Sequence, residues 1–169
     1  MPSESTIDGI IAFAGRLKEI DLDALREGLT IAKLHRQLEQ IIENDLASWG
    51  LTARQIEILE VLYHHREGVL TPAELSDEVG LTRSAMTGAL DALEKLGHTV
   101  RTPHPTDRRM VSISLTLAGR DFISYHLPER YRKVNRIVSS MTQNERTLLL
   151  ASYTKMITLL KSDAGEASK

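Results

Sequence analysis

Apolar residues recur at helical spacing along most of the chain, and they alternate with polar residues over a short stretch near residues 110–116. Pro128 lies inside one periodic stretch and is expected to kink or break that helix. The tail from Ser162 is expected to fray. The pattern predicts, in chain order, helices over 6–20, 23–48 and 52–67, a very short extended piece at 69–70, and helices over 72–79 and 82–96. Strands over 98–103 and 110–116 follow, and then helices over 118–139 and 142–161.

Several helix ends carry recognisable start and stop signals. A threonine hydroxyl can accept a backbone N–H while an acidic or amide side chain three residues later bonds back, which is the capping-box arrangement. Pro72 suits the first position of its helix, and Gly50, Gly80 and Gly97 suit left-handed stops. The three predicted capping boxes are Thr52…Gln55, Thr71…Glu74 and Thr142…Glu145.

The stretch HPTDRRMVSISLT, residues 104–116, joins a charged segment to an alternating one. Val111, Ile113 and Leu115 are expected to face one side of a strand, and the serines between them the other side. The charged segment before the strand contains Asp107 and two adjacent arginines. It is either an ordinary surface hairpin turn or a finger that touches an anionic partner.

The chain divides into a compact central unit, residues 51–117, and two flanking helical regions, 1–50 and 118–169. The flanking helices have broad apolar stripes without an obvious core of their own. Such stripes favour a second copy of the chain as the missing partner, so both flanking regions are predicted to form a homodimer. The alternative is a monomer in which these helices pack on each other and on the central unit.

Composition limits the functional classes. The formal net charge of the 169 residues is −2, so a basic surface for nucleic acid can only be local. Cysteine is absent, which excludes disulfides and thiolate metal sites. A membrane-length apolar run and a signal pattern are also missing, so we expect a cytoplasmic protein with no membrane partner. Without a phosphate-binding loop, a nucleophile elbow or a metal-ligand cluster, we expect no enzyme, no catalytic or metal site and no cofactor.

Residues 72–79 and 82–96 form a short helix, a glycine turn and a second helix, which is a helix-turn-helix arrangement. The second helix has a non-apolar face that begins at its N-terminal end, where a recognition helix meets base edges and phosphates. A strand hairpin follows directly, as in a winged helix. Residues 82–110 hold five basic against three acidic residues, a local charge of +2. The residues of the face are Arg83, Ser84, Thr87, Gly88 and Asp91, and the first four are the predicted DNA contacts.

These segments resemble the MarR family of bacterial winged-helix regulators. The resemblance rests on TARQIEILEVL, TPAELSDEVGLTRSAMTGALDALEKLG and DRRMVSISLTLAG. The wing motif of the family corresponds here to Asp107, Arg109, Ile113, Leu115-Thr116 and Gly119. The resemblance covers about residues 25–161 as one continuous domain. It implies a mainly α fold with a small β-wing, in which a winged helix-turn-helix lobe is joined to N- and C-terminal dimerisation helices.

The resemblance also implies a function. A homodimer would bind a pseudo-palindromic operator in double-stranded DNA, commonly as a repressor released by a small aromatic or phenolic ligand. Arg83, Ser84, Thr87 and Gly88 would face the major groove, although Gly88 stands where a larger contact residue is frequent. Arg109 would be the minor-groove or backbone arginine, with Asp107 as its orienting partner and Arg108 as a phosphate contact or a solvated residue. His35, Arg36 and Tyr63 would line the ligand crevice.

A second function stays open at this point. The near-neutral charge and Gly88 are compatible with a winged-helix protein–protein adaptor that does not bind DNA. The two hypotheses differ in whether a DNA site or a heteromeric protein partner is found.

Overall fold

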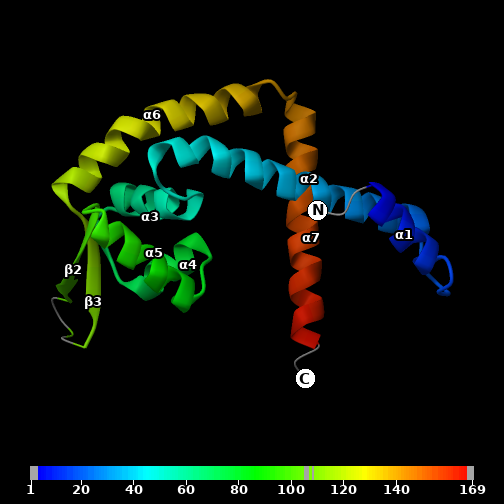
Figure 1. Ribbon diagram of the computed structural model, residues 1–169, viewed down its shortest axis with the longest axis horizontal. Helices are drawn as coiled ribbons and strands as arrows, with labels where there is room; N and C mark the ends of the chain where they lie inside the picture. Colours follow the sequence, from blue (N-terminus) through cyan, green and yellow to red (C-terminus); the bar gives the residue numbers. More distant parts are fainter. Residues whose placement is uncertain (1–3, 105–106, 108, 167–169) are drawn as a thin grey trace.

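The computed structural model describes residues 4–104, 107 and 109–166, with side chains described up to residue 163. The helices and strands follow the predicted order (Figure 1). Their bounds are α1 Glu4–Ala14, α2 Leu22–Leu46, a 3-10 turn Ala47–Trp49, α3 Ala53–His64, β1 Val69–Leu70, α4 Pro72–Val79, α5 Arg83–Lys95, β2 Thr99–Pro103, β3 Val111–Leu115, α6 Leu117–Ser139 and α7 Gln143–Glu166.

The central unit is a lobe with its own hydrophobic core. Helices α3, α4 and α5 supply most of the fully buried side chains, and the sheet and the start of α6 close the core. Because these helices bury one apolar stripe each, their opposite faces stay in solvent. The largest buried residues of the core are Ile56, Ile58, Leu59, Leu62, Leu75, Met86, Leu90, Leu93, Ile113 and Ile123.

The sheet has three antiparallel strands in the order β1-β3-β2. The two residues of β1 pair with Ser114 and Ile113, so only the base of the β2–β3 hairpin has a third strand. The predicted alternation along β3 is wrong in one respect: Ser112 is 2% exposed, while Val111 is exposed. As the central strand, β3 is covered on both faces near its middle, so a small serine is buried next to Ile113.

The flanking helices form long arms rather than a second core. In Figure 1, α1 and the lobe lie at opposite ends of α2, while α7 crosses α2 at a distance from the lobe. Tyr153 of α7 contacts His35 of α2 at this crossing, with 3.4 Å between the hydroxyl and Nδ1. Apolar side chains stay exposed along the arms, among them Ile31, Leu34, Leu38, Ile41, Ile42, Val134, Ile137, Leu148, Leu150 and Leu160.

Some predicted boundaries change. The first helix ends at Ala14, because the chain turns back through Glu19, at φ 71°, so that α1 folds onto α2 and Asp8 pairs with Arg26. The third helix ends at His64 rather than at 67. Gly68, at φ 64°, directly precedes β1. Helix α6 is unbroken at Pro128.

Other expectations about helix ends and faces are also corrected. Helix α7 continues to Glu166, so residues 162–166 of the tail expected to fray are helical. Residues 167–169 of that tail lie outside the described residues. Helical periodicity predicts that Ala85 and Leu96 face inward, but Ala85 of α5 and Leu96 at its C-cap are exposed, since they lie at the edges of the apolar stripe. Within the described ranges, no helix combines the length and the apolar character needed to cross a membrane.

Candidate nucleic-acid interface

Local caps fix the start of α4, its end at the turn, and the start of α5. The Thr71 hydroxyl accepts the Glu74 N–H, and the Glu74 carboxylate accepts both the Thr71 N–H (2.7 Å) and its hydroxyl (2.8 Å). These hydrogen bonds, first the backbone one and then the hydroxyl one, hold the pKa of Glu74 below its usual value. Gly80, at φ 68°, ends α4, and the Thr82 hydroxyl accepts the Ala85 N–H to start α5. The direction of α5 is therefore set by local sequence.

The predicted contact face of α5 is exposed. Arg83, Ser84, Thr87 and Gly88 all lie in solvent. The Thr87 hydroxyl donates to the Arg83 carbonyl at 2.9 Å, so its oxygen remains available only as an acceptor. A Cβ added at Gly88 would meet nothing within 4 Å, so this face carries a gap between its larger side chains.

The wing brings its own charged residues next to this helix. The Asp107 carboxylate accepts the backbone N–H of Arg109 at 2.9 Å, and the Met110 N–H donates to the Asp107 carbonyl at 2.9 Å. Asp107 thus shapes the turn at the backbone of Arg109, which leaves the guanidinium exposed. Arg108, the other predicted wing contact, lies outside the described residues.

A hollow connects the helix and the wing. It is lined by residues from the start of α4, by Arg83 and Thr87 of α5, and by Met110 and Val111 of the wing. The structure therefore brings the N-terminal end of α5 and the tip end of the wing to one concave surface, although they are about twenty-five residues apart in sequence. Such a surface suits a convex ligand with an anionic backbone.

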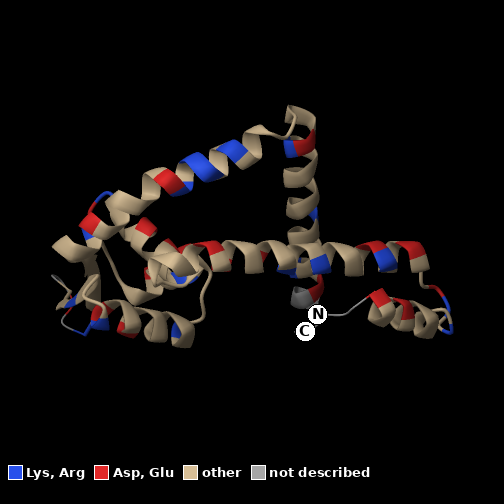
Figure 2. Cartoon of the chain, turned by 45° about the horizontal axis from the view of Figure 1, so that its top comes forward, with Lys and Arg blue, Asp and Glu red and all other residues tan. Residues whose placement is uncertain are grey.

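The positive charge that residues 82–110 can offer a ligand is smaller than their number of basic residues indicates. Arg101 of β2 donates to Asp91 and to Glu94 of α5, at 2.6 Å in each case. These bonds, with that to Asp91 first, raise the pKa of the guanidinium above its already high value. Among the described residues of 82–110, the basic side chains outside any ion pair are Arg83, Lys95 and Arg109. Figure 2 shows that basic residues also line α6, away from the helix-turn-helix.

Sequence reasoning missed the role of Arg101, which it counted only as a positive charge. A signal was present, because Asp91 and Glu94 are three residues apart and therefore share one side of a helix. The pairing of that side with β2 could not be read from the spacing, since it depends on how the hairpin folds back over α5.

The three predicted ligand residues do not share a pocket in the described part of the chain. His35 contacts Tyr153 and lies 3.5 Å from the Glu39 carboxylate. Arg36 lines a shallow hollow on α2 with Glu39, Gln40 and Glu43. Tyr63 lies on α3, where the Arg120 guanidinium sits 5.6 Å from its ring centre. Their assignment to a ligand stays a prediction.

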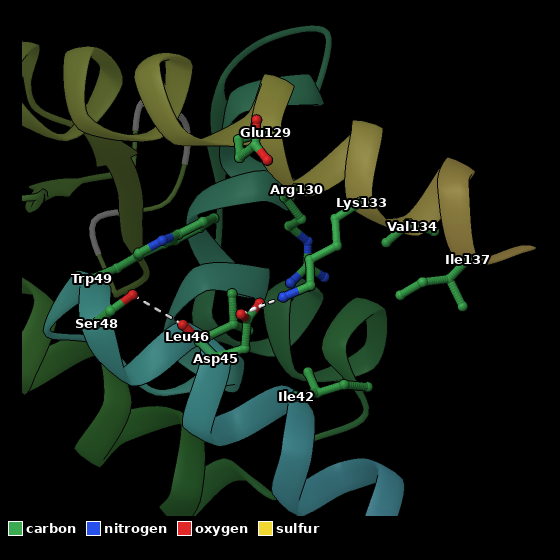
Figure 3. A pocket seen from close by; sticks show the side chains of 10 residues that line it. All are labelled: Ile42, Asp45, Leu46, Ser48, Trp49, Glu129, Arg130, Lys133, Val134 and Ile137. Atoms are coloured by element: carbon green, nitrogen blue, oxygen red, sulfur yellow. Dashed lines mark hydrogen bonds and ion pairs between the residues drawn. The ribbon is translucent and has the colours of Figure 1, made fainter.

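A different crevice lies between the end of α2 and α6 (Figure 3). Trp49, Ile42, Val134 and Ile137 supply apolar walls, and Arg130 and Lys133 supply cations. Lys133 pairs with Asp45 inside the crevice. Because both cations are paired with carboxylates, an anionic group could bind Lys133 only in place of Asp45, while the apolar walls suit a small apolar body.

A polar network fastens the lobe to α6 beside this crevice. The Tyr131 hydroxyl donates to Glu60 at 2.7 Å, and His64 Nε2 lies 2.7 Å from the same hydroxyl. Because the hydroxyl proton goes to Glu60, the imidazole must be the donor to Tyr131. Burial, followed by the bond to Glu60, raises the pKa of Tyr131 to about 12. Arg130 also pairs with Glu60, at 3.3 Å.

The fold and this surface together define a winged helix-turn-helix protein. A sequence profile of the MarR family matches residues 49–110. The HTH-type transcriptional repressor YetL of Bacillus subtilis (strain 168) is 27% identical over 131 residues, which are 78% of each chain. These matches show that the chain is similar to the MarR family of transcriptional regulators, a class of proteins that are not enzymes.

Solved structures confirm the fold. AbsC, a MarR family transcriptional regulator from Streptomyces coelicolor, superposes with a TM-score of 0.72 at 22% identity, over 86% of this chain and 97% of AbsC. The S. aureus MepR–DNA complex gives a TM-score of 0.70 at 22% identity, over 79% of this chain and 97% of MepR. A mainly helical chain with a small wing was expected from the sequence, and this expectation is confirmed.

Proposed function

We propose that this protein regulates transcription by binding double-stranded DNA with α5 in the major groove and the wing against the neighbouring backbone or minor groove. The observation that carries the proposal is the shared concave surface, to which the N-terminal end of α5 and the wing both contribute. Arg83, Ser84 and Thr87 supply the α5 contacts, and Arg109 supplies the wing contact. The likeness to a protein solved as a DNA complex supports this proposal.

We further propose that the active form is a homodimer on a pseudo-palindromic operator. The exposed apolar residues of the arms need a partner, and a second copy presents the same faces. Few free cations remain on one lobe, so two lobes are needed for a useful electrostatic contribution. Two half-sites about 10 bp apart would then fit the two lobes. We infer repression, the role that the name of YetL states for that protein, and a cytoplasmic location where such DNA is accessible.

We place the effector in the crevice of Figure 3. A small aromatic or phenolic acid could stack on Trp49 while its carboxylate competes with Asp45 for Lys133. Since the crevice joins α2 to α6, and α6 is tied to the lobe through Tyr131, an occupant there would change the separation of the two lobes.

The test is site selection from random duplexes, followed by binding titrations at several salt concentrations. Arg109→Ala should weaken binding and reduce the slope of log affinity against log salt by about 0.9 for each lost phosphate contact. Arg16→Ala is the matched control and should leave the slope unchanged, because Arg16 lies between the end of α1 at Ala14 and the start of α2 at Leu22. Figure 1 shows α1 at the end of α2 opposite the lobe. An Arg109→Ala variant with the wild-type slope would show that the wing assignment is wrong.

A protein–protein adaptor is the second candidate, favoured by the few free cations on the lobe. It predicts that no duplex is enriched in the selection, and that a heteromeric protein partner co-purifies in a fixed ratio. Enrichment of a duplex with two related half-sites would exclude it.

A further inference from the structure

The β2–β3 hairpin has little support toward its tip. Strand β1 pairs with β3 only at Ser114 and Ile113. Beyond Ile113 the hairpin continues as two strands, through the pairs Thr102–Ser112 and Pro103–Val111. A two-stranded ribbon is only marginally stable and free to twist, so the position of its tip depends on how its base is held.

Arg101 sits at the last position of β2 where the hairpin is still three-stranded, because its partner in β3 is Ile113. From this position its guanidinium reaches across to α5 and bonds two carboxylates that lie one helical turn apart. The Arg101 N–H also lies 3.4 Å from the second carboxylate, that of Glu94. A planar guanidinium bonded at two nitrogens to two fixed acceptors resists rotation as well as separation.

The ion pairs that Arg101 forms with Asp91 and Glu94 are unfavourable for binding an anion nearby. The Asp91 side chain is 58% exposed and follows Thr87 by one turn on the face predicted to meet DNA. A carboxylate at that place repels phosphate. The positive charge of Arg101 is balanced by the two carboxylates that it bonds, so it adds no net attraction for phosphate. A surface selected only for positive charge would not contain these two acids.

We propose that Arg101 is a positioning residue that fixes the wing relative to α5, and that Asp91 and Glu94 serve this geometry at the expense of local charge. This inference rests on the proposed DNA-binding function. It makes a prediction of unusual sign, because removing two negative charges from a DNA-binding surface ordinarily strengthens binding.

The experiment compares two double variants by fluorescence anisotropy on the duplex selected by the wild-type chain. Asp91→Ala/Glu94→Ala removes the acceptors of Arg101 and should weaken binding at least about fivefold. Asp77→Ala/Glu78→Ala removes two exposed carboxylates from α4 that form no ion pair among the described residues, and it is the matched control. The control should bind as tightly as the wild type or tighter.

Arg101→Lys separates positioning from direct contact. A lysine keeps the charge, and it would serve a phosphate contact almost as well, but it cannot bond both carboxylates in one plane. We expect weakened binding with an unchanged salt slope, and at least tenfold faster amide exchange at Thr102 and Ser112 without DNA. The thermal midpoint of each variant shows that the fold is retained.

The outcomes are distinct. Tighter binding by Asp91→Ala/Glu94→Ala, with wild-type binding intact, would overturn the positioning role alone. Binding as tight as wild type by Arg101→Lys, without faster exchange in the hairpin, would assign Arg101 to a direct phosphate contact and also overturn it. A wild-type chain that enriches no duplex would overturn the proposed function, and this inference with it.

Discussion

Gly119 is the glycine that this fold can least replace. It lies buried in the first turn of α6, against the backbone of residue 98 at the start of the wing. A Cβ added there would lie 2.0 Å from the His98 carbonyl oxygen and 2.8 Å from its carbonyl carbon. That carbonyl oxygen is not free to move, because it accepts the Thr116 N–H at 3.0 Å and lies 3.3 Å from the Thr116 hydroxyl.

Gly119→Ala should therefore separate α6 from the wing. Overpacking typically costs about 1–3 kcal/mol, and weakening a buried hydrogen bond adds about 1 kcal/mol. We expect a loss of about 2–4 kcal/mol in the free energy of unfolding, or roughly 5–15 °C in thermal midpoint for a chain of this size. Gly88→Ala is the same chemical change in open space, and it should stabilise α5 by about 0.5–1 kcal/mol.

Urea unfolding followed by far-ultraviolet circular dichroism measures both variants. The chain concentration must be equal in all samples, because the stability of a self-associating protein depends on it. If Gly119→Ala unfolds at the wild-type urea concentration, or shifts in the same direction as Gly88→Ala, then the close approach to His98 does not explain this glycine.

Two further predictions concern pH. His98 is partly buried, its Nδ1 atom is buried without a hydrogen-bond partner among the described residues, and burial lowers the pKa of the ring. The folded state therefore binds fewer protons there, so stability should fall as pH drops below the ordinary histidine value of about 6.5, and His98→Leu should flatten this dependence in urea titrations from pH 7.5 to 5. The lowered pKa of Glu74 contributes stability above about pH 4.5 that is lost as pH falls further, so Glu74→Gln should remove that part of the acid transition. An unchanged acid profile in either variant would contradict the corresponding assignment.

The helices of the lobe could be predicted because their signals are local. Thr52 and Thr71 form the predicted capping boxes, and Gly50, Gly80 and Gly97 adopt the expected left-handed conformation. Each of these features depends on residues within a few positions of one another, so sequence spacing is enough to find them. The exposed face of α5 follows from the same periodicity.

The charge and burial of the site could not be predicted in this way. Arg101 counts as a free cation in the sequence, yet it is bonded to two acids on α5. Ser112 lies on the predicted polar side of its strand, yet it is buried. Both outcomes depend on partners from other elements, which local pattern does not specify.

The sequence by itself determined the capped starts and glycine stops of the lobe helices, which stripe of each is apolar, and that a charged turn precedes a strand, because chain connectivity and helical geometry act over a few residues. The tertiary structure decided that the wing folds against α5 through Arg101, and that Gly119 touches His98. It also decided that α7 crosses α2 away from the lobe. The physical reason is that packing joins residues far apart in sequence, and each such contact depends on all the others being made.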